Sequence, residues 1–244
     1  MEFWGITDNG MVRRQNQDVF KVLYDEVNDV AVLAVCDGMG GARAGNVASE
    51  LAAEVFMHEI VTCLDSTGAN VNIARNMADA VLAANKAVYN KSVHSVEYAG
   101  MGTTLTAAIS TADGEVVVNV GDSRAYHVTP SGITQITKDH SVVEDMVTRG
   151  DLTRAQARKH PNKNLITRAL GTSDEEDPDI FFLSLKSGEF ILLCSDGLSN
   201  VLLDNEIMVE PLRGGSVRAS CEKLVEIALS RGAPDNVTVV LFRK

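Results

Sequence analysis

The sequence predicts an α+β fold in which β-sheets pack together and helices cover them. Blocks of short apolar runs separated by turns alternate with long segments whose apolar residues recur at helical spacing. This grouping differs from the regular strand-helix alternation of a doubly wound sheet. The chain has 244 residues, of which 45% are hydrophobic and 23% charged, as expected for one globular core. We therefore expect a single domain over residues 1–244.

The first third of the chain predicts three strands followed by two helices. Apolar runs at Phe3–Thr7, Asp18–Leu23 and Val30–Cys36 are separated by turn-forming residues. The next segments, from about Gly45 to Cys63 and from Ile73 to Val88, carry apolar residues at helical spacing. Each of these helices therefore has one apolar face to bury against a sheet.

The rest of the chain begins with a predicted three-stranded meander over residues 104–128, with turns at Asp113-Gly114 and Gly121-Asp122. Capping-box patterns that start at Ser141 and Thr153 predict two short helices after the meander. The remaining expected elements are strands at 180–185 and 190–194, a helix at 217–228 and a strand at 237–242.

Charge and apolar patterning exclude several classes of protein. The formal charge of −11 and the pI of about 4.9 argue against nucleic-acid and anionic-membrane partners, which require clustered Lys and Arg. The longest apolar run, Val30–Cys36, is far shorter than the ~18 residues that span a bilayer. The N-terminus lacks the features of a signal peptide, and the four cysteines form no CxxC pair. We expect a soluble, cytoplasmic protein with reduced thiols.

Four aspartates lie at the ends of apolar strands. Asp37 and Asp196 each follow a strand and precede glycine, Asp122 follows another strand, and Asp235 precedes the last one. An Asp-Gly pair by itself makes a turn, which is the competing explanation at each position. If the four converge, two carboxylates ~4 Å apart repel by about 4 kcal/mol at an effective dielectric of 20. Divalent cations are the simplest compensation for such repulsion.

The ligand types indicate which cation such a cluster would hold. The motifs supply oxygen ligands without His or Cys, which suits Mg²⁺ or Mn²⁺ better than Zn²⁺ or Cu²⁺. Calcium fits the same ligand type, although the EF-hand spacing is absent. Glycine beside Asp37 allows close backbone approach, so Gly38 can offer its carbonyl oxygen as a further ligand.

Other catalytic motifs fail on spacing. The glycine-rich loop after Asp37 would need glycine at Arg43 to match a dinucleotide-binding fingerprint, and no GxxxxGK[ST] motif occurs. Cys36 is one residue too far from Arg43 for a cysteine-based phosphatase, and the charge of Asp37 would disfavour its thiolate. Ser195 and His140 do not form a hydrolase triad, because Ser195 lacks the GxSxG context.

Eight short motifs, taken in order, resemble those of the type 2C protein phosphatases. They occur at Gly10–Asp18, Asp37–Gly41, Met101–Thr104, Asn119–Arg124, Asp139–Ser141, Leu165–Gly171, Ser195–Leu198 and Pro234–Asn236. Each motif alone is weak, but the ordered set over the whole chain is specific. The resemblance implies a four-layer αββα sandwich, with two central, mainly antiparallel sheets and the metal site at one end of them. It also implies a small helical flap, about residues 138–172, beside that site.

The same resemblance implies a metal-dependent phosphatase that hydrolyses phosphoserine and phosphothreonine by direct attack of metal-activated water. Asp37 matches the ligand that bridges two Mn²⁺ or Mg²⁺ ions, and Gly38 matches a ligand that binds through its carbonyl. Asp196 and Asp235 match the residues that complete the second ion. Asp18 matches an acidic residue that holds metal-bound water.

A third, weaker metal site in bacterial members uses the residue that matches Asp122. Arg13 matches the arginine that grips the phosphate, for which the planar guanidinium fork is suited. Three departures leave the third ion and the general acid open. Met39 stands where some members have a histidine that protonates the leaving alkoxide, Gln17 replaces an acidic residue, and Asn200 stands where an aspartate would support the third ion.

The flap is basic in an otherwise acidic protein. Between Arg149 and Arg168, against the single acidic residue Asp151, it carries Arg149, Arg154, Arg158, Lys159, Lys163 and Arg168. One interpretation is docking of phosphorylated, often acidic protein segments, with His160 touching the substrate; the other is a helix pair with a solvated basic face. The acidic run Asp174–Asp177 after the flap is expected to be a solvated loop.

The favoured hypothesis is therefore a monomeric phosphatase whose partners are phosphorylated proteins, including a Ser/Thr kinase and the substrates of that kinase. A catalytically silent domain of the same fold that binds a phosphoprotein is the first alternative. Asp37, Asp196, Asp235 and Arg13 are all present and count against it. A metal-dependent hydrolase of small phosphate esters is the second alternative.

Overall fold

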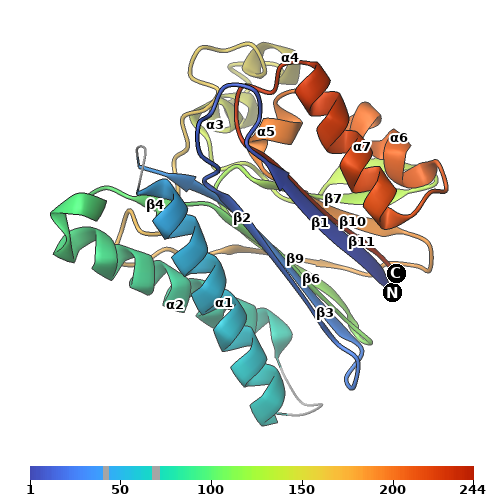
Figure 1. Ribbon diagram of the computed structural model, residues 1–244, viewed down its shortest axis with the longest axis horizontal. Helices are drawn as coiled ribbons and strands as arrows, with labels where there is room; N and C mark the ends of the chain where they lie inside the picture. Colours follow the sequence, from blue (N-terminus) through green and yellow to red (C-terminus); the bar gives the residue numbers. More distant parts are fainter. Residues whose placement is uncertain (41–43, 68–71) are drawn as a thin grey trace.

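The computed structural model describes residues 1–40, 44–67 and 72–244 and contains two antiparallel β-sheets (Figure 1). Gly41 and Arg43, which belong to the motifs above, lie outside the described residues. One sheet consists, in spatial order, of β1 (Glu2–Asp8), β11 (Val237–Arg243), β10 (Phe190–Cys194), β7 (Arg124–Thr129) and β8 (Gly132–Gln135). The other consists of β2 (Asp18–Asp25), β3 (Val30–Met39), β5 (Leu105–Thr111), β6 (Gly114–Val120) and β9 (Asp179–Leu183), with β4 (Gly102–Thr103) paired to β3.

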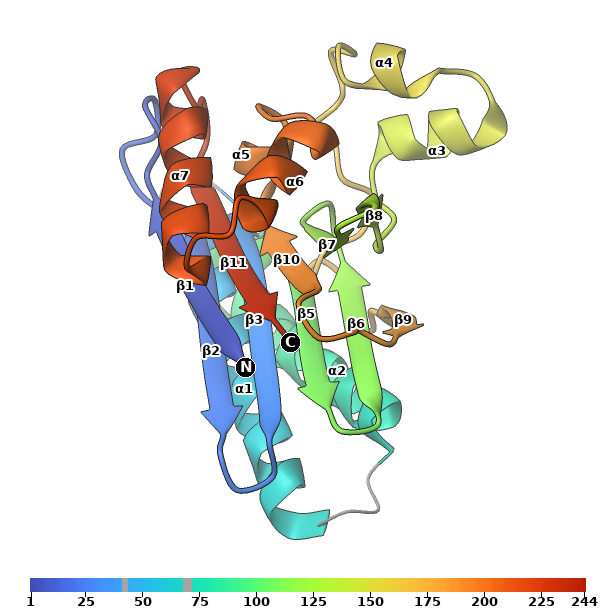
Figure 2. The same ribbon diagram turned by 90° about the vertical axis from the view of Figure 1, so that its right-hand side faces the viewer.

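Helices cover the outer faces of both sheets. The sheet that contains β3 is covered by α1 (Gly45–Thr67) and α2 (Ile73–His94), and the other sheet by α6 (Asp204–Leu212) and α7 (Val217–Ser230). The short helices are α3 (Val142–Arg149), α4 (Arg154–Ala157), α5 (Asp196–Ser199) and the 3-10 helix η1 (Val96–Tyr98). The predicted αββα arrangement is confirmed (Figures 1 and 2).

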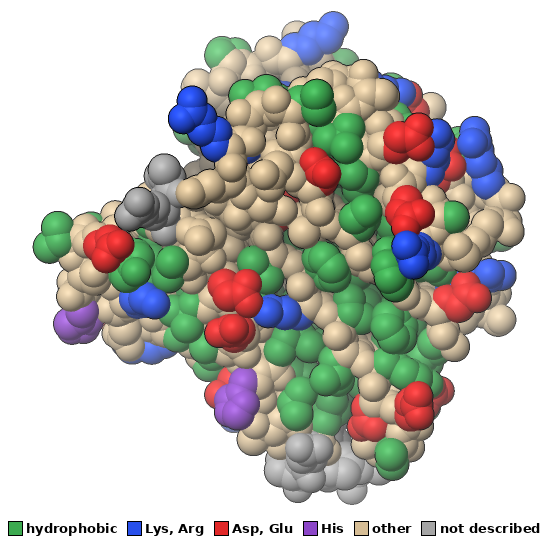
Figure 3. Space-filling view, viewed as in Figure 1, with side chains coloured by type: hydrophobic (Ala, Val, Ile, Leu, Met, Phe, Trp, Pro, Cys, Tyr) green, Lys and Arg blue, Asp and Glu red, His purple; other side chains and the backbone are tan. Residues whose placement is uncertain are grey.

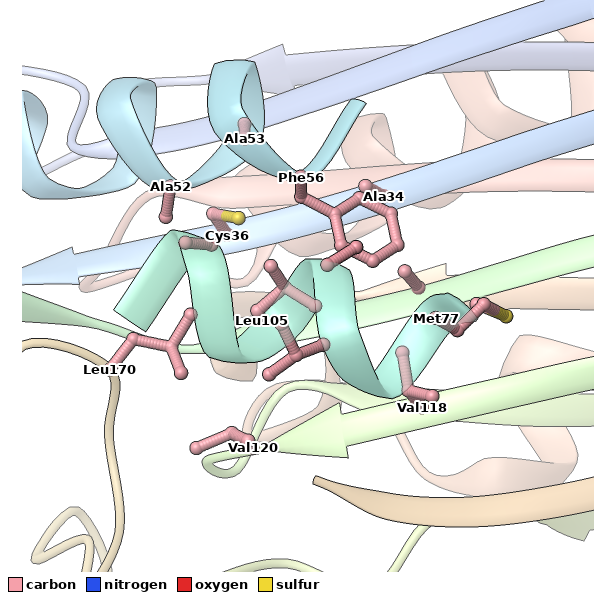
Figure 4. Packing of buried hydrophobic residues seen from close by; sticks show 14 of the residues in the cluster. Ala34, Cys36, Ala52, Ala53, Phe56, Met77, Leu105, Val118, Val120 and Leu170 are labelled. Atoms are coloured by element: carbon pink, nitrogen blue, oxygen red, sulfur yellow. The ribbon is translucent and has the colours of Figure 1, made fainter. Parts of the chain in front are cut away.

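Three apolar layers hold this arrangement together, and strand β3 takes part in two of them. Its residues Val32, Ala34 and Cys36 pack toward α1 and α2, where Figure 4 shows Ala34 close to Phe56. The intervening residues, such as Leu33, belong to the layer between the two sheets. Because successive side chains of a strand point to opposite faces, burial on both faces explains the uninterrupted apolar run that the sequence shows here.

Strand β3 extends beyond its predicted end. It continues through Asp37 and Gly38 to Met39, because Gly102 and Thr103 of β4 pair with its last residues. The expectation that Asp37 follows the strand is therefore wrong: Asp37 lies inside the strand, near its end. The residues around Asp37 do not reveal this pairing, because the partner strand β4 is distant in the chain.

The predicted meander is also wrong in its third strand. Strands β5 and β6 pair with each other, but β7 pairs with β8 and β10 in the opposite sheet. The chain crosses between the sheets at Gly121, which has φ +108, a conformation that favours glycine. All three strands are apolar, so periodicity alone does not assign a strand to a sheet. The crossing places Asp122 between the two sheets.

Residues 138–172, the flap segment, project beyond the end of the sheets with α3 and α4 (Figure 2). The capping box at Thr153 forms as predicted, with both reciprocal hydrogen bonds. At α3, Ser141 accepts a hydrogen bond from the Glu144 backbone N–H, but the Glu144 carboxylate pairs with Arg154 instead of closing the box. An ion pair thus joins the two flap helices.

The acidic run after the flap segment is not simply a solvated loop. Glu176 accepts a hydrogen bond from Arg168 Nε at 2.7 Å, and Asp174 pairs with Lys86 of α2. Acidic and basic side chains are interspersed over the face shown in Figure 3. Within the described ranges, no helix is long and apolar enough to cross a bilayer.

Candidate metal centre

A cavity of about 520 Å³ opens at the end of the sheets from which the flap segment projects, and it is lined by residues of both sheets. Asp37 reaches it from β3, and Asp122 from the crossing after β6. Asp196 and Asp235 line it from the segments after β10 and before β11. Asp18 lies directly opposite Asp37 in the register of β2 and β3. Five carboxylates from distant parts of the sequence therefore meet at one place.

Asp37 is held in place by hydrogen bonds of its backbone to Thr104. Its N–H donates to Thr104 Oγ1 at 2.9 Å, and its carbonyl accepts from the Thr104 N–H at 2.9 Å. Burial, followed by the charges of the neighbouring aspartates, raises the pKa of Asp37 well above its ordinary value. A side chain at Gly38 would place its Cβ 2.1 Å from the Gly45 carbonyl oxygen. Glycine is thus required where the chain passes closest to the start of α1.

Asp18 is buried and has one satisfied oxygen. Its Oδ2 accepts hydrogen bonds from Ser195 Oγ and Thr238 Oγ1, both at 2.7 Å. Its Oδ1 is buried without a hydrogen-bond partner among the described residues. Burial raises the pKa of Asp18 to about 6 despite these two hydrogen bonds. Ser195, which is not a nucleophile by its sequence context, here positions a carboxylate.

Asp196, the first residue of α5, shows the same pattern. Its Oδ2 accepts from Asn200 Nδ2 at 2.9 Å, and its Oδ1 is buried without a partner among the described residues. Burial and then the charges of Asp122 and Asp235 raise its pKa well above the ordinary value. The pKa of Asp122 rises to about 7, also chiefly through burial. The pocket therefore holds more negative charge than its protein neighbours compensate.

Arg13 is the cation at the mouth of the pocket. Its Nη2 donates to Asp235 Oδ2 at 2.7 Å, while its side chain remains 52% exposed. The hydrogen bond and the charge of Asp235 raise the pKa of Arg13. Asn236, a residue that sequence reasoning gave no role, accepts from the Gln17 N–H at 2.9 Å and donates to the carbonyls of Asn9 and Gln15. It ties the loop that carries Arg13 to the start of β11.

The donor set fits divalent cations. Among the described residues, two buried carboxylate oxygens lack hydrogen-bond partners, the nearby carboxylates repel one another, and the clustered aspartates offer only oxygen as a metal ligand. Within the described residues, no three His, Cys, Asp or Glu side chains already form a complete cage. Asp235 points one oxygen at Arg13, so its carboxylate is shared between that arginine and the pocket. The residues that would hold two ions are Asp37, Gly38, Asp196 and Asp235.

Not every predicted residue reaches the pocket. His160 is not among the described residues that line it, and its Nδ1 accepts a hydrogen bond from the Asn162 N–H at 3.2 Å. His140, on the other hand, has a role near the site that the sequence did not predict. Its Nδ1 accepts a hydrogen bond from the Gly121 N–H at 3.0 Å, one residue before Asp122. The only sign of this role in the sequence is that His140 lies within the Asp139–Ser141 motif. Arg14 lines the pocket beside Arg13.

Replacing Thr238 with valine is expected to destabilise the protein by about 1–3 kcal/mol, because Asp18 loses one of its two hydrogen bonds while staying buried. Urea denaturation in EDTA measures the free energy of unfolding. Thr134→Val on β8 is the matched control, since that threonine is exposed and should stay within about 0.5 kcal/mol of wild type. Equal denaturation midpoints for the two variants would contradict this account of Asp18.

Two antiparallel sheets between helices, with clustered carboxylates and an arginine at one end, define the metal-dependent phosphatase class that the sequence resembles. The chain belongs to the protein phosphatase 2C family, because the model of that family matches residues 12–232.

Named relatives agree with this membership. The chain is 36% identical over 244 residues to the serine/threonine phosphatase stp of Listeria monocytogenes, covering 98% of this chain and 94% of the relative. It is 38% identical over 235 residues to the serine/threonine protein phosphatase PstP of Mycobacterium tuberculosis, and this match spans only 43% of PstP. Among solved structures, the catalytic domain of PstP in complex with two manganese ions superposes with a TM-score of 0.83 at 35% identity, covering 98% of this chain and 96% of that one.

Proposed function

We propose that this protein hydrolyses phosphoserine and phosphothreonine in phosphorylated proteins and that it requires two Mn²⁺ or Mg²⁺ ions. Asp37, Asp196, Asp235 and the carbonyl of Gly38 hold these ions in the proposal. The observation that carries it is the convergence of carboxylates from both sheets into one pocket, where two buried carboxylate oxygens have no hydrogen-bond partner in the part of the chain that the structure describes. Residues 1–244 act as one phosphatase domain, with the flap segment beside its active site.

The bound ions would supply a nucleophile at neutral pH and neutralise the charge of the phosphoryl group. The protein supplies the remaining functions. Arg13 is exposed enough to turn its guanidinium from Asp235 toward a phosphate, where it offers two parallel hydrogen bonds. Asp18 keeps Oδ1 available as an acceptor for water in the pocket, because Ser195 and Thr238 hold the other oxygen.

The leaving group must receive a proton from a source other than residue 39, since Met39 has no proton to give. Met39 lines the pocket beside Gly40, so the pocket wall is apolar where some relatives of this family carry histidine. In this proposal, water in the pocket protonates the alkoxide. The reaction needs no covalent phosphoenzyme in this proposal, because water activated by the bound ions would be the nucleophile.

The proposed partners are phosphorylated proteins, including a Ser/Thr kinase and the substrates of that kinase, from which the enzyme removes phosphate. We propose that the enzyme acts in the cytoplasm and as a monomer. Support comes from the names of the relatives, which describe serine/threonine phosphatases. The basic side chains of the flap segment are mostly engaged within the protein: Arg154 with Glu144, Arg168 with Glu176. Lys159 is exposed and is the better candidate for contact with an acidic protein segment.

Chelation tests the proposal directly. Phosphate release from a phosphothreonine peptide is expected to require Mn²⁺, to stop in excess EDTA and to return when Mn²⁺ is restored. The same protein assayed with p-nitrophenyl phosphate should show a lower kcat/KM than with the peptide. Release that continues in EDTA would overturn the metal mechanism. No release with Mn²⁺ would favour the silent phosphoprotein-binding domain, and a preference for the small ester would favour the hydrolase of small phosphate esters.

A further inference from the structure

A second cavity, of about 900 Å³, lies between the flap segment and helices α5 and α6. It shares two carboxylates, Asp122 and Asp196, with the metal pocket. Two of its arginines are already neutralised: Arg124 pairs with Asp139 at 2.6 Å, and Arg154 pairs with Glu144. The two shared carboxylates have no such arginine partner among the described residues.

Lys163 of the flap segment approaches one of these two carboxylates, Asp196, through Asn200. Its Nζ lies 3.5 Å from Asn200 Oδ1, and the other side of the same amide donates from Nδ2 to Asp196 Oδ2 at 2.9 Å. Two hydrogen bonds thus connect the Lys163 ammonium to the Asn200 amide, and the Asn200 amide to the Asp196 carboxylate of the metal pocket.

Asn200 determines what this end of the pocket is able to bind. A carboxylate at this position would supply an anionic ligand for a cation beside Asp196. An amide supplies no charge, and this one is committed to hydrogen bonds on both sides. A divalent ion at Asp122 and Asp196 would therefore find two carboxylates, one neutral amide and a neighbouring ammonium whose charge repels it.

We propose that the Lys163 ammonium takes the place of a third divalent cation beside Asp122 and Asp196. This inference rests on the proposed two-ion function, since it concerns Asp122, which holds neither of the two proposed ions, and the oxygen of Asp196 that faces Asn200. Lys163 belongs to the flap segment, so its contact with Asn200, which itself binds Asp196, ties the flap segment to the metal pocket. A third ion must displace the lysine to bind, and in doing so it releases this contact.

Counting bound ions tests the proposal without relying on activity. Mn²⁺ titrations followed by calorimetry, with free Mn²⁺ measured by electron paramagnetic resonance, should give two bound ions in wild type and a third only weakly. In Lys163→Met the affinity for the third ion should increase at least about tenfold, because a like charge is removed next to it. Lys163→Arg keeps the charge and should resemble wild type.

Lys159→Met is the matched control, because Lys159 carries the same charge in the same segment but is exposed. An equal gain in Lys159→Met would show a general effect of net charge and would overturn the proposal, as would unchanged third-ion affinity in Lys163→Met. Lys163 is only partly buried, and thermal denaturation will verify that each variant is folded. If the wild type binds two ions and releases phosphate but the variants do not differ as expected, only the proposed role of Lys163 is refuted. If the wild type binds fewer than two ions, the proposed function is refuted as well.

Discussion

Replacing Asp37 with asparagine is expected to lower kcat/KM for a phosphothreonine peptide by about 10³-fold or more, because the variant loses a carboxylate that would hold the bound ions. The same change is expected to raise the thermal stability of the protein in EDTA. Asp37 has a raised pKa in the folded protein, so its contribution to stability is present at low pH and is lost as pH rises above the ordinary carboxyl range. Asparagine has no charge to bury and avoids that loss.

The combination of opposite effects distinguishes a metal ligand from a structural residue. Substitution of an aspartate with a structural role would destabilise the protein. Substitution of an uncompensated carboxylate in a binding site would instead stabilise the metal-free protein. Addition of Mn²⁺ should raise the melting temperature of wild type strongly and that of Asp37→Asn weakly. Kinetic assays with Mn²⁺ and melting curves in EDTA and in Mn²⁺ provide these comparisons.

Asp113→Asn is the matched control for this prediction. Asp113 also precedes glycine at a strand end, in the turn between β5 and β6, but it is exposed and lies outside the pocket. It should change neither activity nor stability appreciably. If Asp37→Asn costs less than tenfold in kcat/KM, or if the two variants behave alike, the assignment of Asp37 is wrong.

Replacing Arg13 with alanine is expected to lower kcat/KM by about 10- to 100-fold, the effect of losing a charge-assisted hydrogen-bonded pair to the phosphate. Arg13→Lys should lose part of this, because an ammonium does not reproduce the planar fork. Affinity for Mn²⁺ should not fall in Arg13→Ala, since Arg13 shares Asp235 with the pocket and its removal frees that carboxylate.

Arg14→Ala serves as the control for the charge at the pocket mouth. Arg14 is exposed, lines the same pocket and carries the same charge, but has no ion pair with Asp235 among the described residues. It is expected to retain at least about half of the wild-type kcat/KM. Similar losses in the two alanine variants would mean that the pocket attracts substrate through its overall charge and that Arg13 has no special contact.

Much of the fold could be predicted because its determinants are local. The helices α1 and α2 have one apolar face each, and the strand β3 has an apolar run that is explained by burial on two faces. The predictions that failed involved pairing between distant segments. The extension of β3 depends on β4, and the placement of β7 depends on β10. The helix α6, which contains Pro211, was not predicted at all.

The candidate site divides in the same way. Its aspartates could be named from the sequence, because an apolar run followed by Asp-Gly is visible in a single segment and the ordered motifs resemble those of a known family. The residues that hold them could not be assigned. Ser195 and Thr238 come from different segments and meet only at Asp18. His140 likewise reaches Gly121 only after folding.

By itself, then, the sequence determined the class of fold, the oxygen-only chemistry of the site and the carboxylates that supply it. These properties depend on residue type and on short-range spacing. Only the tertiary structure decided that Asp235 is shared between Arg13 and the pocket, that two carboxylate oxygens find no partner among the described residues and that Lys163 approaches Asp196 through Asn200. These contacts join segments that are up to 222 residues apart, and their charges interact because folding buries them together.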